Sequence, residues 1–222
     1  MPNPLGQRES AAIPELDASL IWKKEPRYDS FQLAAGGVGV NIMTFFQVPR
    51  NVAGSGFAVA KTEAETNMQT AGQIGKPNQF LLYGFTVEVL PAQAAALAIS
   101  EVSSNWALIY HPSVFRFVLG ANNIQLEVPL EKIPTGVGPT GFATSVGAAA
   151  VTTPQVMSAM TNGVPHSRYY YNFTVPGSKL PLLIQGDQTF RCEIAYPLGN
   201  LILTVHATRV RCYMHGVYGQ GK

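Results

Sequence analysis

Apolar and polar residues alternate with a period of two in several stretches of the chain, which is typical of β-strands with one buried face. In the clearest stretch, Leu81, Tyr83, Phe85, Val87 and Val89 fall in one phase. Similar alternation or dense aromatic and apolar content marks further candidate strands: 40–48, 115–119, 124–130, 169–175, 190–194 and 201–214. The pattern therefore predicts roughly seven to nine strands.

The last candidate strand changes phase along its length. Its apolar residues stand at odd positions from Leu201 to Ala207 and at even positions from Val210 to Met214. Because one extra residue moves every following side chain to the other face, the change predicts a bulge or bend near Thr208.

Helical signals are few and short. Pro91 opens an alanine-rich run over 92–99, and Pro154 opens a second candidate turn of helix that ends near Met160. A parallel α/β sheet needs many more crossover helices than these two. We therefore expect an all-β fold, an antiparallel β-sandwich or barrel with two short helices and long loops.

Charge is scarce for a chain of 222 residues. Charged residues make up 13%, about half the usual share of roughly 25%, while 46% of residues are hydrophobic. A free monomer keeps its surface polar and charged, so this composition indicates a surface that partners cover. A net charge of +2 gives no footprint for direct nucleic-acid binding, and no run is long and apolar enough to predict a transmembrane segment.

The first 35 residues differ in composition from the rest. Residues 1–30 hold 9 of the 28 charged residues together with four prolines, and they lack apolar periodicity. We expect residues 1–35 to form an extended N-terminal arm, followed by a single β-sandwich domain over 36–222. One interpretation is a disordered tail. The other is an arm that orders on a neighbouring subunit, with Leu20, Ile21 and Trp22 as its anchor.

A second unusual segment is an uncharged insertion. No Asp, Glu, Lys or Arg occurs from Ile133 to Ser167, where Gly, Ala, Thr and Ser dominate. A loop this long and apolar is poorly suited to water, so we expect it to contact another subunit through Val137, Phe142 and Val146.

The sequence indicates no catalytic chemistry. Glu88, Glu127 and Glu193 each stand in the polar phase of a candidate strand, which is usually the solvated face. The four histidines are isolated, no His-x-His pair occurs, and neither a Gly-x-Ser-x-Gly motif nor a phosphate-binding loop is present. We therefore expect a non-enzyme without cofactor or metal. Cys192 and Cys212 are expected to be buried thiols, with a disulfide between them as the alternative.

Aromatic residues offer a different function. Tyr169, Tyr170 and Tyr171 are consecutive, and exposed Tyr and Trp platforms bind sugars in carbohydrate-binding sandwiches. Trp106 would be a further sugar contact. Packing between subunits also favours Tyr and Trp, and it accounts better for the low charge, so we expect Tyr169 and Tyr171 at an interface.

A charge-poor sandwich with an N-terminal arm and long small-residue insertions resembles bacteriophage virion proteins. It is most similar to the single jelly-roll capsid subunits of tailless icosahedral phages. The polar segment 61–78, which leads into a strand over 79–90, contributes to the resemblance, which covers 40–217. It implies two four-stranded sheets in a jelly roll.

The resemblance also implies a function. It indicates a coat protein of the virion, synthesised in the host cytoplasm, whose partners are copies of itself and other virion proteins. Jelly rolls also include lectins and cupins. A carbohydrate-binding module, lectin-like or receptor-binding with a glycan as its partner, is therefore the alternative, and a cupin-type enzyme is the third hypothesis.

Overall fold

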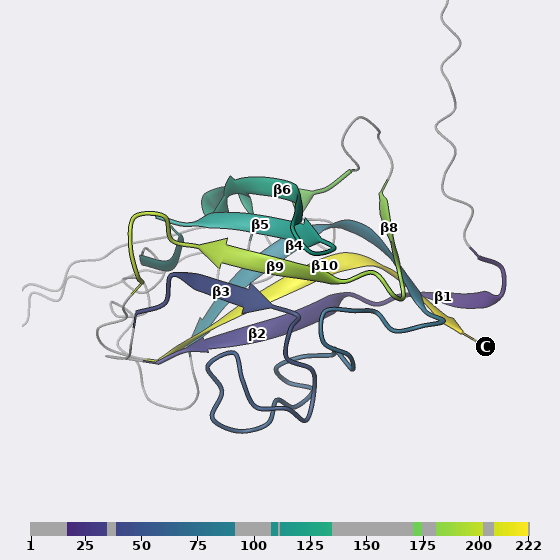
Figure 1. The fold of residues 1–222 in the computed structure, drawn as a ribbon, viewed down its shortest axis with the longest axis horizontal. Coiled ribbons are helices and arrows are strands. Elements are labelled where there is room, and N and C mark those ends of the chain that lie inside the picture. Colours follow the sequence, from purple (N-terminus) through teal and green to yellow (C-terminus); the bar gives the residue numbers. More distant parts are fainter. Residues whose placement is uncertain are drawn as a thin grey trace, which may run out of the picture.

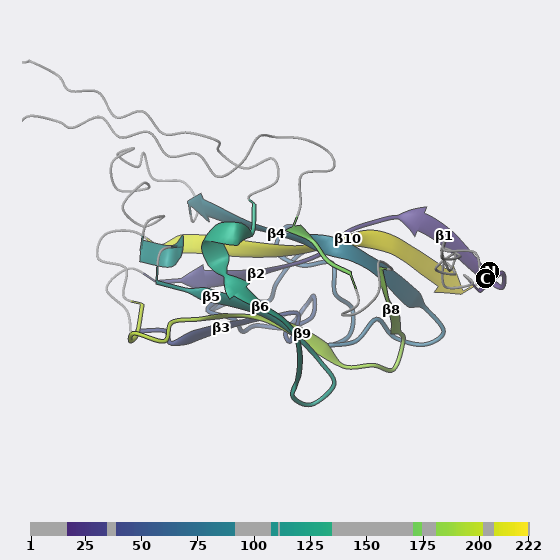
Figure 2. The ribbon, with the colours of Figure 1, turned by 90° about the horizontal axis from the view of Figure 1, so that it is seen from above.

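The computed structural model describes residues 17–34, 39–91, 108–110, 112–134, 171–174, 181–201 and 207–221. These residues form two antiparallel β-sheets that pack face to face, as the two layers in Figure 2 show. The prediction of an all-β sandwich is confirmed. No helix among the described residues is long and apolar enough to cross a membrane.

The larger sheet is built around two long central strands, β4 (Gln79–Pro91) and β10 (Thr208–Gly221), which run antiparallel along most of their length. Two shorter strands follow one another along the free edge of β10, and two more along the free edge of β4 (Figure 1). These edge strands are β1 (Leu20–Lys24) and β2 (Arg27–Leu33) on β10, and β7 (Tyr171–Asn172) and β8 (Leu182–Gln185) on β4.

The smaller sheet has the order β3-β9-β5-β6. Its strands are β3 (Ile42–Phe45), β9 (Phe190–Ala195), β5 (Val114–Leu119) and β6 (Asn123–Pro129). A single turn of 3-10 helix, η1 (Leu130–Lys132), follows β6. β6 is largely exposed, whereas β5 and β9 supply a fully or almost fully buried residue at every second position.

The core lies between the two sheets and is rich in phenylalanine. Phe85 of β4 meets Phe115 and Phe117 of β5, with ring centroids 5.2 Å apart in each case, and Phe173 at 5.8 Å. Cys192 and Cys212 are both free and buried, on β9 and β10 of the facing sheets. Period-two alternation therefore gives each sheet one apolar face, and these faces form the core.

One register shift interrupts the pairing of β10 with β4. From Thr208 to Met214 the burial of β10 alternates without interruption, and the register against β4 shifts between His215 and Gly216. Gly216 permits this shift because a Cβ there would lie 2.1 Å from the backbone oxygen of Leu81. The extra residue of this bulge is Tyr83 of β4, because His215 pairs with Gly84 and Gly216 pairs with Leu82. The bend expected near Thr208 depends on residues 202–206, which lie outside the described residues.

The described part of the expected N-terminal arm belongs to the sandwich. β1 and β2 are hydrogen-bonded to β10, so the boundary expected at residue 35 does not separate an arm from the domain. β2 escapes detection from sequence because two residues on its inward phase are charged: Arg27 and Asp29 are 8% and 0% exposed. Residues 1–16 lie outside the described part, as do both expected helices and the insertion from residue 135 onward.

Candidate functional site

The connection between β3 and β4 spans residues 46–78 and runs beside β2 (Figure 1). Within it, residues 51–60 form a tight hairpin, here called the 51–60 hairpin. Asn51 donates its backbone N–H to Lys61 O at 2.8 Å, and Gly54 and Phe57 exchange both backbone hydrogen bonds. Gly56 has φ of 80°, and a Cβ there would lie 1.8 Å from Gln32 O, so this turn requires glycine.

The 51–60 hairpin exposes apolar side chains and carries no charge. Val52 is 46% exposed and Val59 is 73% exposed. Ala53, Ala58 and Ala60 are exposed beside them. Clustered apolar residues on a soluble surface mark interaction sites more often than scattered ones do. This hairpin is therefore the candidate functional site.

The tip of the hairpin is fixed to the larger sheet. Ser55 O accepts a hydrogen bond from Gln32 N at 2.9 Å. Phe57 is 8% exposed, and its ring lies 5.3 Å from the Arg209 guanidinium and 5.5 Å from Lys61 Nζ. Two cations on one aromatic ring hold the hairpin in one orientation, so its apolar face is presented as a rigid surface.

The base of the hairpin is fixed by a buried ion pair. Lys61 Nζ lies 2.8 Å from Asp29 Oδ1, and both side chains are 0% exposed. Asp29 Oδ2 also accepts the backbone N–H of Phe46 at 2.6 Å. Burial raises the pKa of Asp29 and lowers the pKa of Lys61, because removal from water disfavours each charged form more than the pairing favours it.

Charged residues surround the hairpin beyond this pair. Arg50 is paired with Glu63, and Arg209 Nη1 lies 3.2 Å from Glu65 Oε1. An uncharged apolar centre inside a rim of charged residues is the usual composition of a protein–protein interface.

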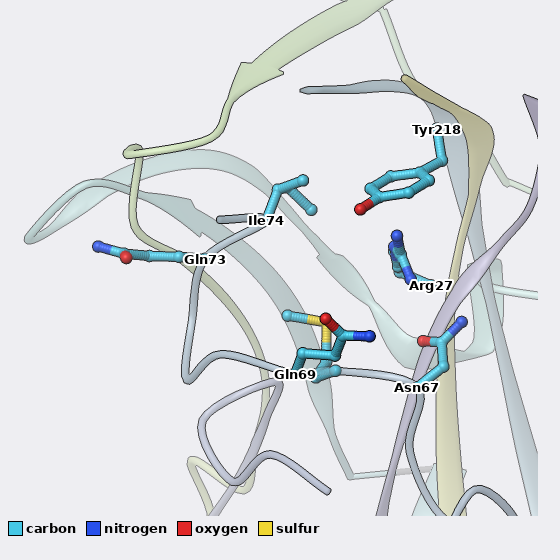
Figure 3. Close-up of a pocket in the computed structure, with 7 residues that line it drawn as sticks. Arg27, Asn67, Gln69, Gln73, Ile74 and Tyr218 are labelled. Carbon is cyan, nitrogen blue, oxygen red and sulfur yellow. The ribbon is translucent and has the colours of Figure 1, made fainter. Parts of the chain in front are cut away.

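A small cavity lies where the connection between β3 and β4 crosses the junction of β2 and β10. Figure 3 shows Arg27 beside the ring of Tyr218, and the guanidinium carbon is 3.7 Å from the ring centroid. Arg27 also pairs with Glu25, and Asn67 donates to Pro26 O at 2.8 Å. The cavity measures about 10 Å³, far below the range of ordinary ligand sites. Its groups bind one another, which indicates a packing junction.

The predicted anchor residues divide between buried and exposed positions. Leu20 is 7% exposed, and Trp22 lies against Gly219, where a Cβ would be 2.9 Å from the indole ring. Ile21 is 58% exposed, so it alone of the three presents most of its side chain to solvent. The strand β1 therefore uses Leu20 and Trp22 to attach to its own β10.

The other predicted contact residues fall into two groups. Val137, Phe142, Val146, Tyr169 and Trp106 lie outside the described residues. Tyr171 is on β7, where it pairs with Phe85 and packs partly buried against the core, so it does not form an open aromatic platform.

Residues 51–60 were not singled out from sequence, although a signal was present. The run is uncharged, contains two glycines, and stands between Arg50 and Lys61. It is much shorter than the uncharged insertion over 133–167, so the sequence alone does not distinguish it.

Comparison with protein-family models, with curated protein sequences and with solved structures found no match. Among the described residues no group of three His, Cys, Asp or Glu side chains is arranged to hold a metal ion.

Proposed function

We propose that this chain is a virion coat subunit with a jelly-roll fold, which assembles with copies of itself through the 51–60 hairpin. The proposal depends on the 51–60 hairpin, which is uncharged, exposed and fixed at both ends, and which stands on a β-sandwich.

The strand pairing supports the jelly-roll assignment. Leaving β1 aside and taking β7 and β8 as one interrupted edge strand reduces the ten strands to eight. The first of these pairs with the last (β2 with β10) and the second with the seventh (β3 with β9). The third pairs with the sixth (β4 with β7 and β8) and the fourth with the fifth (β5 with β6). A long β-hairpin that is rolled up on itself gives this nested order of strand pairs, and this order is the topology of a jelly roll.

Jelly rolls serve as coat proteins, lectins and cupins, so the fold does not select among these functions. The low charge of the whole chain favours a protein whose surface is covered by neighbours. The hairpin supplies a specific surface for such a contact, because its valines are exposed while its backbone is fixed at the tip and at the base. A preorganised surface loses little conformational freedom on association.

Sedimentation velocity of the full chain over a range of protein concentration tests the proposal. We expect large discrete species that grow with concentration. Val59→Asp should shift the protein towards monomer, because burying an unpaired carboxylate in the contact costs at least about 1.4 kcal/mol, a tenfold loss of affinity. Gln220→Glu adds the same charge at an exposed position of β10, and it should sediment like the parent protein.

Two outcomes would contradict different parts of the proposal. A monomer at every concentration would contradict self-assembly. Assembly of the Val59→Asp protein at the parent concentration would contradict the hairpin as the contact surface.

A further inference from the structure

The buried pair formed by Asp29 and Lys61 is placed for a covalent reaction. Lysine is almost never fully buried, yet both of these side chains are 0% exposed. Water hydrates neither charge in this buried position. Attraction between the two charges only partly offsets the free energy of hydration that is lost. A neutral amide between the two groups would remove both charges from the interior.

We propose that Lys61 and Asp29 condense within the folded chain to form an intramolecular isopeptide bond between Lys61 Nζ and Asp29 Cγ. This activity goes beyond the proposed function and does not rest on it. It would fix the base of the 51–60 hairpin covalently to strand β2.

The reaction needs no reagent besides the two side chains. The Lys61 ammonium first gives one proton to the Asp29 carboxylate, which yields a neutral amine and a carboxylic acid. The amine nitrogen then attacks Cγ, and one carbon–oxygen bond breaks. The departing oxygen leaves as water with two of the three ammonium protons, and the third proton remains on the amide nitrogen.

The surroundings favour each step. Lys61 Nζ is 2.8 Å from Asp29 Oδ1, so nucleophile and electrophile are held together at high effective concentration. Burial raises the pKa of Asp29 and lowers the pKa of Lys61, and both directions increase the neutral forms that react. In solution, hydration of the two ions opposes amide formation. Water is excluded from this pair, so that hydration is absent.

Oxyanion stabilisation comes from the backbone. Attack on Cγ places negative charge on the carboxyl oxygen that is retained, and Phe46 N–H is 2.6 Å from Asp29 Oδ2. Phe46 has a left-handed backbone with φ of 70°, although its side chain is fully buried. The residue with this unusual backbone conformation is the one whose N–H donates to Asp29. We therefore assign Phe46 N–H as the group that stabilises the tetrahedral intermediate.

The pairing is selective for Asp29. Glu65 also acts electrostatically on Lys61, but its carboxylate is held by Thr62 and by Arg209. Glu65→Gln is therefore a matched control that removes a neighbouring carboxylate and leaves both reacting groups in place.

Intact-mass measurement of the purified full chain, followed by tryptic mapping, tests the proposal. We expect a mass about 18 Da below the sequence mass, the loss of one water. Trypsin should not cut after Lys61, and the peptide 28–50 should be joined to the peptide 51–116. Glu65→Gln should retain the loss and the link. Lys61→Arg should show its full sequence mass, since a guanidinium stays protonated and does not condense.

The wild-type peptide map decides the question even if Lys61→Arg fails to fold. Cleavage after Lys61 with both peptides at their sequence masses would overturn the proposal and leave an ion pair alone. Loss of water confined to the peptide 28–50, without a link to Lys61, would overturn it as well, because it would indicate internal cyclisation of an aspartate.

Discussion

Replacement of Phe85 by alanine tests how the two sheets are joined. Phe85 lies on β4 of the larger sheet, is 0% exposed, and contacts Phe115 and Phe117 on β5 of the smaller sheet. Its ring also contacts Phe173. Truncation of a buried phenylalanine costs about 3–5 kcal/mol, and these three ring contacts place the expected value near the upper end, about 4–5 kcal/mol. This is a large part of a typical folding free energy of about 5–15 kcal/mol.

Urea denaturation followed by circular dichroism measures this cost. With a slope of about 2–3 kcal/mol per molar urea, the midpoint should fall by about 1.3–2.5 M while the slope stays unchanged. Leu198→Ala is the control, because Leu198 is 90% exposed and its truncation should change stability by less than about 0.5 kcal/mol. A loss below about 1 kcal/mol for Phe85→Ala would refute the packing of β4 against β5.

Three further predictions concern glycine and titratable residues of the larger sheet. Gly216→Ala should lower the free energy of unfolding by about 2 kcal/mol or more, because the new Cβ meets the backbone of β4. The control is Gly219→Ala, whose new Cβ meets side-chain atoms, and it should lower the free energy of unfolding by less in the same urea experiment. Burial lowers the pKa of His215 to about 4 from its ordinary 6.5. As the pH falls, the unfolded chain therefore binds a proton at this residue before the folded chain does. The free energy of unfolding should fall by about 3 kcal/mol between pH 6.5 and pH 4. The same titration of His215→Gln should lack this component, and an NMR pKa near 6.5 for His215 would contradict the burial. Burial raises the pKa of Glu88, so its ionised form weakens the fold at pH 7. Glu88→Gln should therefore unfold at a higher urea concentration than the parent protein at pH 7, and a lower midpoint would contradict this sign.

Several strands were predictable because their neighbours impose a regular pattern. β5 and β9 each bury apolar side chains at alternate positions, so period-two alternation in the sequence corresponds to the inward and outward faces of the smaller sheet. On β4 the alternation predicts one inward phase from Leu81 to Val89, whereas the core contains Phe80 and Leu82 before the bulge at Tyr83, and Phe85, Val87 and Val89 after it. The class of fold follows from these strands and from the scarcity of helical signals.

β2 and the bulge of β4 opposite Gly216 were not predictable from pattern alone. β2 buries the charged residues Arg27 and Asp29, and their burial depends on Tyr218 and Lys61, which are distant in sequence. The position of the bulge opposite Gly216 depends on the close approach of Leu81 O, which is also a tertiary contact. Sequence periodicity contains neither kind of information.

The position of the candidate site was not predictable from the sequence. Low charge indicated a covered surface, and the sequence directed attention to the anchor around Trp22. In the structure, Trp22 packs on its own chain at Gly219, whereas Val52 and Val59 stay exposed because Asp29, Lys61 and Phe57 hold the hairpin in place. Which apolar residues are exposed is decided by these long-range contacts.

Cryo-electron microscopy of the largest species formed by the full-length protein tests the central claim most directly. The account predicts closed shells in which each subunit is a jelly-roll sandwich and the 51–60 hairpin is buried against a neighbouring copy. Shells with this hairpin open to solvent would contradict the proposed contact, and a protein that forms only monomers would contradict the proposed coat function.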